Sequence, residues 1–364
     1  MNRKSSISFR FDSLDGLRGV AAFSVLIHHV YQQYYLKTTG DHVKLFDWFG
    51  GWGVSLFFVL SGFCIHSSQA IQRQNGLLGL NYRKFFLHRA FRIVPAYYVA
   101  VFFCLLVGFF RTTALIIPPK TICDVISHFL FIYNWMPWTF RSINSVFWTI
   151  AIEVQFYIFY ALIYKWLNFR LGQLFLFIAV GLAWYGIASS LFFNGDPWRV
   201  VWQNIFITTF WSWYLGAILA EWMTRIRARD ESGIERVFVK NEFVFILLII
   251  VLNLFGAFVN PVLFKLHLMI LFVPIGCALL IAGLAFTEDS SRVFSSAFKT
   301  LKWLGEISYS LYLLHPVGIA IALLVFSKHT FISPFFAVIF SFVLAILNYK
   351  LVEKPFMKLR KNLD

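Results

Sequence analysis

The chain is poor in charged residues. Of its 364 residues only 13% are Asp, Glu, Lys or Arg, whereas 59% are hydrophobic and the mean hydropathy is +0.72. A soluble globular domain carries about 25% charged and about 45–50% apolar residues. This scarcity of charge excludes an ordinary soluble domain and predicts a polytopic membrane protein. The 45 Phe and 13 Trp residues agree with that class, because aromatic side chains suit the lipid-facing surface and the membrane interfaces.

Cysteine is also scarce, and its spacing excludes two kinds of site. The four cysteines form no CxxC pair and no metal-ligand pattern: Cys64, Cys104 and Cys277 fall in apolar segments and Cys123 in a predicted loop. We therefore expect neither a disulfide framework nor a bound metal. Internal repeats and low-complexity tracts are absent too. The first apolar run begins at Leu14 and lacks a small-residue cleavage site, so we expect a membrane span there and no cleavable signal peptide.

What the sequence does contain is a series of long apolar segments. A window of about 19 residues predicts about ten membrane spans and hence an all-α, polytopic transmembrane helical bundle. The predicted spans cover residues 14–36, 48–71, 90–110, 145–166, 171–193, 200–222, 243–264, 266–287, 303–327 and 331–351. We expect one membrane domain over residues 10–356, with short cytoplasmic tails at 1–9 and 357–364.

The formal net charge of the chain is +15, and the basic residues behind it are distributed according to the order of the predicted spans. In a soluble protein such an excess would point to nucleic acid, but here the basic residues lie in short flanks between apolar segments. Alternate loops and both termini carry them, and the intervening loops are short or nearly neutral. The positive-inside rule therefore places both termini in the cytoplasm and predicts a multi-pass protein of the cell (inner or plasma) membrane, with no nucleic-acid partner.

A few titratable residues fall inside the predicted spans, where they are costly and become functional candidates. The ones that we single out are Arg18, His28, His29, His66, Glu153, Glu306 and His315. Arg18 and His29 are eleven residues apart, which is about three helical turns, so they share one helix face about 16 Å apart. Histidine is a natural general base near neutral pH, and the shared face favours His29 over His28 for that role. A simple hydrogen bond to a neighbouring helix is the alternative for either histidine.

Glu153 lies in the segment WTIAIEVQFY, at a membrane depth similar to that of His29. Tyr157 follows at i+4 on the same face. A carboxylate at that depth could orient and stabilise a histidine, as in a catalytic triad. A structural ion pair with another intramembrane cation is the alternative for Glu153.

Two further segments hold candidates with weaker signals. Arg89 and Arg92 are spaced i, i+3 at the predicted cytoplasmic end of the third span. Their planar forks suit phosphate, but taken alone the pair is better explained as a positive-inside flank. The segment GGWGVSLFFVLSGF contains Ser61 outside any GxSxG elbow, and its glycines favour close helix packing. His315 precedes Pro316, which should free backbone carbonyls, so His315 could line a cavity or cap that break.

Taken together, these segments resemble the acyltransferase-3 family of membrane acyltransferases, from about Leu14 to Phe356. The resemblance rests on five motifs in the same order, on ten predicted spans. They are LDGLRGVAAFSVLIHH with Arg18 and His29, GVSLFFVLSGF, HRAFRIVPAYY with Arg89 and Arg92, WTIAIEVQFY with Trp148 and Glu153, and LGEISYSLYLLHPV followed by EKPF. Two positions depart from the family: Ser55 stands where Asp is common and Val154 where a second Glu is common. We expect a stand-alone member without the esterase-like domain of many relatives.

The resemblance implies an O-acyltransferase that moves an acyl group, usually acetyl, from cytoplasmic acyl-CoA to a hydroxyl, commonly on a carbohydrate or glycan. We hypothesise a catalytic set of His29, Glu153 and Arg18, in which His29 is the general base and Glu153 holds its imidazole. Arg89 and Arg92 would bind the CoA head, and Arg18 would either help to fix that head or line the passage towards His29. The substrate or cavity candidates are Tyr157, Ser61, His315 and Trp148. Direct transfer and an acyl-enzyme relay both remain open. A multi-span transporter or exporter of a glycan, a lipid or a proton-coupled solute is the alternative function.

Overall fold

The computed structural model describes residues 12–36, 39–40, 43–77, 79–228, 269–287, 293–326 and 332–361. Within these ranges the chain is helical and contains no β-strand. The longer helices are α1 (Asp12–Tyr31), α3 (Lys44–Gln74), α4 (Tyr82–Phe110), α7 (Trp148–Ile163), α8 (Leu171–Leu191), α10 (Phe206–Ala228), α14 (Met269–Thr287), α17 (Ser308–Val325) and α18 (Ile332–Asn348). The shorter ones are α5 (Ile122–Phe129), α6 (Pro137–Phe140), α9 (Pro197–Gln203), α15 (Val293–Thr300), α16 (Lys302–Glu306) and α19 (Lys354–Lys361). The predicted all-α class is confirmed.

Five helical stretches of the described residues are long and apolar enough to cross a membrane: residues 45–74, 82–110, 171–191, 308–325 and 332–360, the last of which joins α18 to α19. The other long helices coincide with further predicted spans but are shorter or carry more polar residues. The predicted span 243–264 lies outside the described residues. The number of ten spans and the cytoplasmic location of both termini therefore stay predictions.

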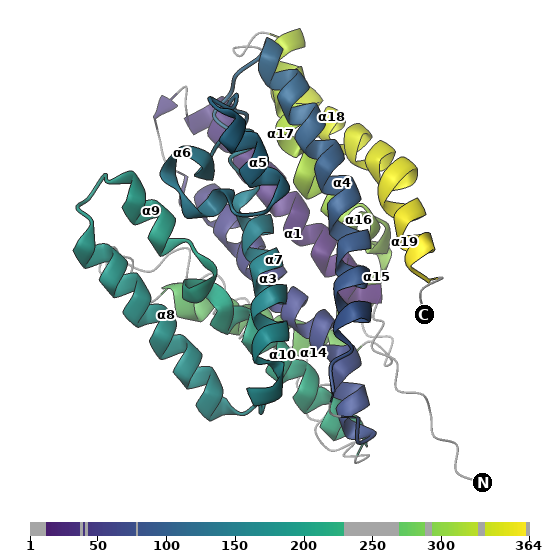
Figure 1. Cartoon of the computed structure of the whole chain (residues 1–364). Helices are drawn as coiled ribbons and strands as arrows, with labels where there is room; N and C mark the ends of the chain where they lie inside the picture. The colour runs from purple at the N-terminus through teal and green to yellow at the C-terminus, as the bar shows by residue number, and fades with distance from the viewer. Residues whose placement is uncertain are drawn as a thin grey trace.

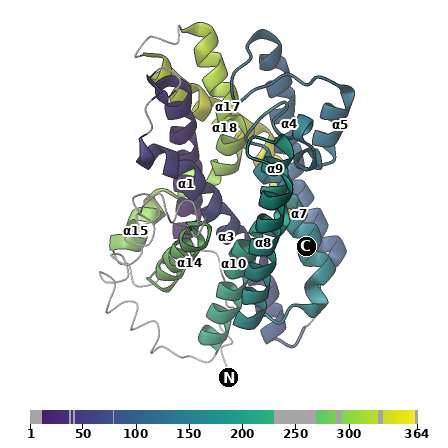
Figure 2. The same cartoon turned by 90° about the vertical axis from the view of Figure 1, so that its left-hand side faces the viewer.

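Helix α1 lies in the middle of the bundle (Figure 1) and packs against α3, α14, α15, α16, α17 and α18. Helices α8 and α9 form one edge and α18 and α19 the opposite edge, and the view from the side shows α8 in front of α10 (Figure 2). Because α1 is central, its polar residues face other helices, which is where intramembrane polar groups are expected.

Helices α3 and α10 approach closely because glycines face the partner backbone. A methyl group added at Gly62 would lie 1.8 Å from the Trp213 carbonyl oxygen, and one added at Gly216 would lie 2.0 Å from that of Val59. Neither distance is possible for a real carbon atom. Small residues at such contacts let helix backbones meet in a membrane. The predicted packing role of the glycine-rich segment is confirmed at Gly62.

Residues 111–144, which lie between two predicted spans, form a packed connection with short helices of their own. Thr121 caps α5 with a capping box completed by Asp124. The His128 ring stacks on Tyr133 with ring centroids 4.0 Å apart, and burial lowers the pKa of His128 to about 4. A connection of 34 residues with buried side chains must satisfy its own backbone groups, and the short helices do so.

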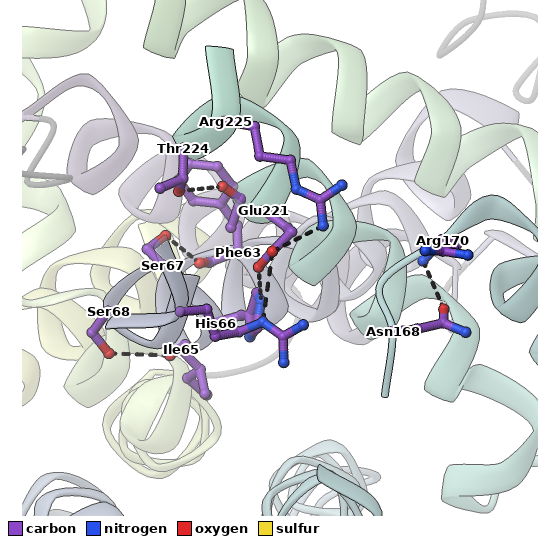
Figure 3. Close-up of polar contacts among 12 residues, drawn as sticks. Phe63, Ile65, His66, Ser67, Ser68, Asn168, Arg170, Glu221, Thr224 and Arg225 are labelled. Carbon is purple, nitrogen blue, oxygen red and sulfur yellow. Dashed lines mark hydrogen bonds and ion pairs between the residues drawn. The ribbon is translucent and has the colours of Figure 1, made fainter. Parts of the chain in front are cut away.

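A buried polar cluster joins α3 to α10 near the ends of both helices (Figure 3). Glu221 lies at its centre: Oε2 is 3.0 Å from His66 Nε2, and Oε1 is 3.1 Å from Arg225 Nη2 and 3.6 Å from Arg73 Nε. The other ring nitrogen of His66 is 2.9 Å from the Tyr160 hydroxyl. One carboxylate thus balances two guanidinium groups and orders His66. We interpret this cluster as a structural lock between the two helices.

Substitution Glu221→Gln should destabilise the fold, because it leaves two guanidinium groups close together without their counter-charge. Breaking a buried pair costs about 3–5 kcal/mol, and the exposure of Arg225 lowers our expectation to about 2–3 kcal/mol. Thermal unfolding of the detergent-solubilised chain would show it as a lower midpoint. Glu306→Gln is the matched control, since Glu306 is exposed and its amide could still accept from Tyr349. Equal midpoints for the two variants would contradict the lock.

Candidate active site

One of the cavities between the described helices is rich in arginine. This arginine cavity is formed by α1, α3, α4, α7 and α17. Its principal polar residues are Arg18, Ser61, Arg89, Arg92, Glu153 and Tyr157. Three guanidinium groups face one carboxylate there, so the cavity favours an anionic ligand. Arg18 also pairs with Asp15 at 2.9 Å, on the preceding turn of α1.

Arg89 and Arg92 share one face of α4, as their spacing predicts. Helix α4 begins at Tyr82, eight residues before the predicted span, and the Asn81 side chain caps it by accepting from the Lys84 amide. The Arg89 guanidinium lies 5.6 Å from the Phe85 ring centroid. Among the described residues its buried Nε has no hydrogen-bond partner. A buried donor without a partner is costly, and an anionic ligand would satisfy it.

Glu153 is held by its neighbours on α3 and α7. The Ser61 hydroxyl donates to Glu153 Oε1 at 3.0 Å, and the Tyr157 hydroxyl donates to the same oxygen. Trp213 Nε1 in turn donates to Ser61 Oγ at 3.3 Å. The carboxylate is therefore fixed in the wall of the arginine cavity. Ser61 and Tyr157, both predicted as cavity residues, contact it directly.

A second cavity contains two histidines and no arginine among its described lining residues. This histidine cavity is formed mainly by α1, α3, α7, α8 and α10. Its lining includes His28, His29, Ser55, Trp148, Tyr185 and Asn204. No lining side chain described by the structure is an Asp, Glu, Lys or Arg. Such a mixture of aromatic and neutral polar side chains suits a neutral polar ligand.

His29 forms a pair with His315. His29 Nδ1 lies 3.0 Å from His315 Nε2, and the two rings stack with centroids 5.0 Å apart. His315 is fully buried and lines neither cavity, so it supports His29 from behind. Its own Nδ1 lies 2.9 Å from the Tyr312 carbonyl oxygen and 3.2 Å from that of Leu311. Of the two readings of His315 left open by the sequence, the structure supports the cap of the helix break, since Pro316 leaves the Tyr312 carbonyl without its amide donor, and it adds the contact with His29.

His28 lies beside His29 in the same cavity. Its Nδ1 donates to the Phe46 carbonyl oxygen at 2.7 Å, and its ring meets that of His29 edge-on at 5.0 Å. A side chain at Gly50 would collide with the His28 ring, because an added methyl would lie 2.5 Å from Cδ2. His28 is therefore part of the cavity wall, although the sequence favoured its neighbour.

The expected contact between Glu153 and His29 is not formed, and this part of the predicted triad is wrong. Glu153 bonds to Ser61 and Tyr157 in the arginine cavity, whereas His29 bonds to His315. Trp148, five residues before Glu153 on α7, lines the histidine cavity instead. Five residues rise about 7.5 Å along a helix, and this separation places Glu153 outside the cavity that Trp148 and His29 line.

The two cavities adjoin each other along α1. Arg18 lines one and His29 the other, and Val54, Phe58 and Tyr312 line both. The Tyr312 hydroxyl lies 2.6 Å from Thr149 Oγ1, which fixes this shared wall. An elongated anionic ligand with its charged end at the arginines could therefore direct its far end towards His29.

Several lining residues were not singled out from the sequence. In the histidine cavity they are Tyr185, Gln203, Asn204, Thr208, Thr209 and Ser212. The polar run at the start of α10, TTFWS, is the signal that could have indicated some of them. Among the described residues no group of His, Cys, Asp and Glu side chains could hold a metal ion.

Comparison with known proteins identifies the family. Residues 11–349 match the profile of the acyltransferase-3 family, described as an acyltransferase domain. The chain belongs to this family. The resemblance inferred from the five motifs is thereby confirmed over almost the whole chain, including the segments that form both cavities. No solved structure matches the chain.

Several curated relatives are bacterial O-acetyltransferases. The chain is 26% identical to the peptidoglycan O-acetyltransferase OatA of Listeria monocytogenes, over 98% of the chain and 58% of that protein. It is 27% identical to the putative peptidoglycan O-acetyltransferase YrhL of Bacillus subtilis, over 94% of the chain and 54% of that protein. A putative O-acetyltransferase of Staphylococcus aureus (strain COL) is 25% identical, over 95% of the chain and 57% of that protein. This acyltransferase-3 chain thus spans slightly more than half the length of these relatives.

Proposed function

We propose that the protein is a multi-pass membrane O-acyltransferase of the cell (inner or plasma) membrane. It would move an acyl group, with acetyl as the first choice, from cytoplasmic acyl-CoA to a hydroxyl group of a carbohydrate or glycan. Family membership and the O-acetyltransferase relatives support the reaction class. The observation that carries the proposal is the juxtaposition of an arginine cavity and a histidine cavity across one shared wall.

The arginine cavity supports an acyl-CoA donor. The CoA head carries several phosphate charges at one end of a long pantetheine arm. Arg18, Arg89 and Arg92 offer three guanidinium groups within one cavity, and arginine matches phosphate geometry. The shared wall then directs the thioester end of the arm towards His29. With both termini in the cytoplasm, as the basic flanks predict, these arginines lie on the side from which CoA arrives.

The histidine cavity supports a hydroxyl acceptor. In this proposal His29 takes the proton from the acceptor hydroxyl as its oxygen attacks the thioester carbonyl carbon. The new C–O bond forms, the C–S bond breaks, and the proton on His29 passes to the departing CoA sulfur. Trp148, Tyr185 and the neutral polar groups around them suit a sugar, which offers both apolar faces and hydroxyls.

Release of free CoA thiol tests the proposed reaction. Membranes containing the full chain would be supplied with acetyl-CoA, and thiol would be measured with and without an added envelope-glycan extract. Mass spectrometry of the extract would then locate a gain of one acetyl group. Glycan-dependent release with acetylated product supports the proposal. Absence of release with acetyl-CoA and longer acyl-CoA donors would overturn it and favour the transporter.

A further inference from the structure

His29 and His315 are 286 residues apart in sequence, and their contact joins α1 to α17. Any neutral imidazole has one N–H donor and one acceptor nitrogen, and the partner of one nitrogen decides the state of the other. The bonds of His315 therefore determine which nitrogen of His29 can accept a proton. These bonds can be followed outward from the backbone of α17.

The chain of bonds starts at a carbonyl that Pro316 releases. In an α-helix the amide of residue 316 would donate to the carbonyl of Tyr312, but proline has no N–H. His315 Nδ1 lies 2.9 Å from that carbonyl oxygen and can replace the missing donor. Because a carbonyl can only accept, His315 carries its proton on Nδ1. The Nε2 atom of His315 is then an acceptor.

The second link fixes His29. His315 Nε2 is 3.0 Å from His29 Nδ1, and since Nε2 accepts, His29 Nδ1 must donate. The lone pair of His29 is then on Nε2, the ring atom on the far side from His315. His315 is fully buried, so water does not compete for its nitrogens. His29 itself lines the histidine cavity.

We propose that His315 is a positioning residue: together with the Tyr312 carbonyl freed by Pro316, it holds His29 in the tautomer whose Nε2 accepts the substrate proton. This inference rests on the proposed function, in which His29 is the base. His315 takes the place that the sequence assigned to Glu153, with a neutral imidazole backed by a backbone carbonyl instead of a carboxylate. When His29 becomes protonated, its Nδ1–H donates more strongly to His315, which stabilises the cation.

Two substitutions separate positioning from simple capping of the helix. Asparagine reaches where Nδ1 lies, so His315→Asn can still cap the Tyr312 carbonyl but offers no acceptor to His29. Glutamine reaches where Nε2 lies, so His315→Gln can accept from His29 Nδ1. We expect His315→Asn to lower kcat by about 10- to 100-fold with KM for acetyl-CoA little changed, and His315→Gln to retain kcat within about fivefold. The opposite order, with Asn active and Gln inactive, would show that His315 only caps the helix.

Nitrogen NMR of the histidine-labelled full chain supplies a readout independent of activity. The His29 signals, assigned by their loss in His29→Ala, should show a protonated Nδ1 and an unprotonated Nε2 in the wild type. In His315→Asn this preference should be lost, and in His315→Gln it should be kept. A wild-type His29 protonated on Nε2 would overturn the inference. The expected tautomer in a protein that releases no CoA would instead refute the proposed function and leave the role of His315 intact.

Discussion

His29→Ala is expected to lower kcat for acyl transfer by about 10² to 10⁴-fold, which is the usual contribution of a positioned general base. The reason is geometric: His29 lines the histidine cavity, with one ring nitrogen fixed by His315 and the other left for substrate. KM for acetyl-CoA should change little, because His29 lies away from the arginine cavity. The measurement is acetyl-CoA-dependent thiol release in membranes that contain equal amounts of folded protein.

His28→Asn is the matched control for this substitution. The amide can keep the hydrogen bond to the Phe46 carbonyl, and His28 already shares the cavity with His29. We expect the control to lose less than about tenfold in kcat, since it removes a wall residue but leaves the base. If His28→Asn abolished transfer and His29→Ala did not, the two histidines would have to exchange roles.

The helical bundle could be predicted from sequence because a bilayer imposes a length on each apolar segment. The relation between Arg18 and His29 was equally accessible, since helical periodicity places them on one side of α1. The partner of His29 was not. Two histidines separated by 286 residues meet only through the packing of α1 against α17, and no local pattern encodes that contact.

The error over Glu153 has a similar cause. Membrane depth counted from the edge of an apolar run is uncertain by about one turn: α7 begins at Trp148, three residues after the predicted edge at 145. One turn is enough to move a side chain from one cavity to the next. The Glu221 cluster went unrecognised because its three partners come from two helices and meet at their ends, next to a basic segment.

The double substitution Arg89→Gln, Arg92→Gln should raise KM for acetyl-CoA by about 10- to 100-fold and change kcat much less. Both guanidinium groups face the arginine cavity, and the Nε of Arg89 is a buried donor without a partner among the described residues. Each charge-assisted bond to phosphate is worth about 1.5–3 kcal/mol. The loss of two such bonds could raise KM by more than 100-fold, but Arg18 remains in the cavity and should limit the rise. The effect should therefore be on donor binding rather than on proton transfer.

The sharpest form of this test compares two donors. Acetyl-pantetheine carries the same thioester but lacks the nucleotide, so the double substitution should leave its KM nearly unchanged while it raises that of acetyl-CoA. Arg83→Gln is the matched control, because Arg83 is an exposed arginine at the start of the same helix and does not line the cavity. An equal rise for both donors would mean that the arginines shape the cavity without binding the CoA head. A rise in KM confined to acetyl-CoA would indicate that the arginine cavity binds the CoA head of a substrate whose thioester reacts in the histidine cavity.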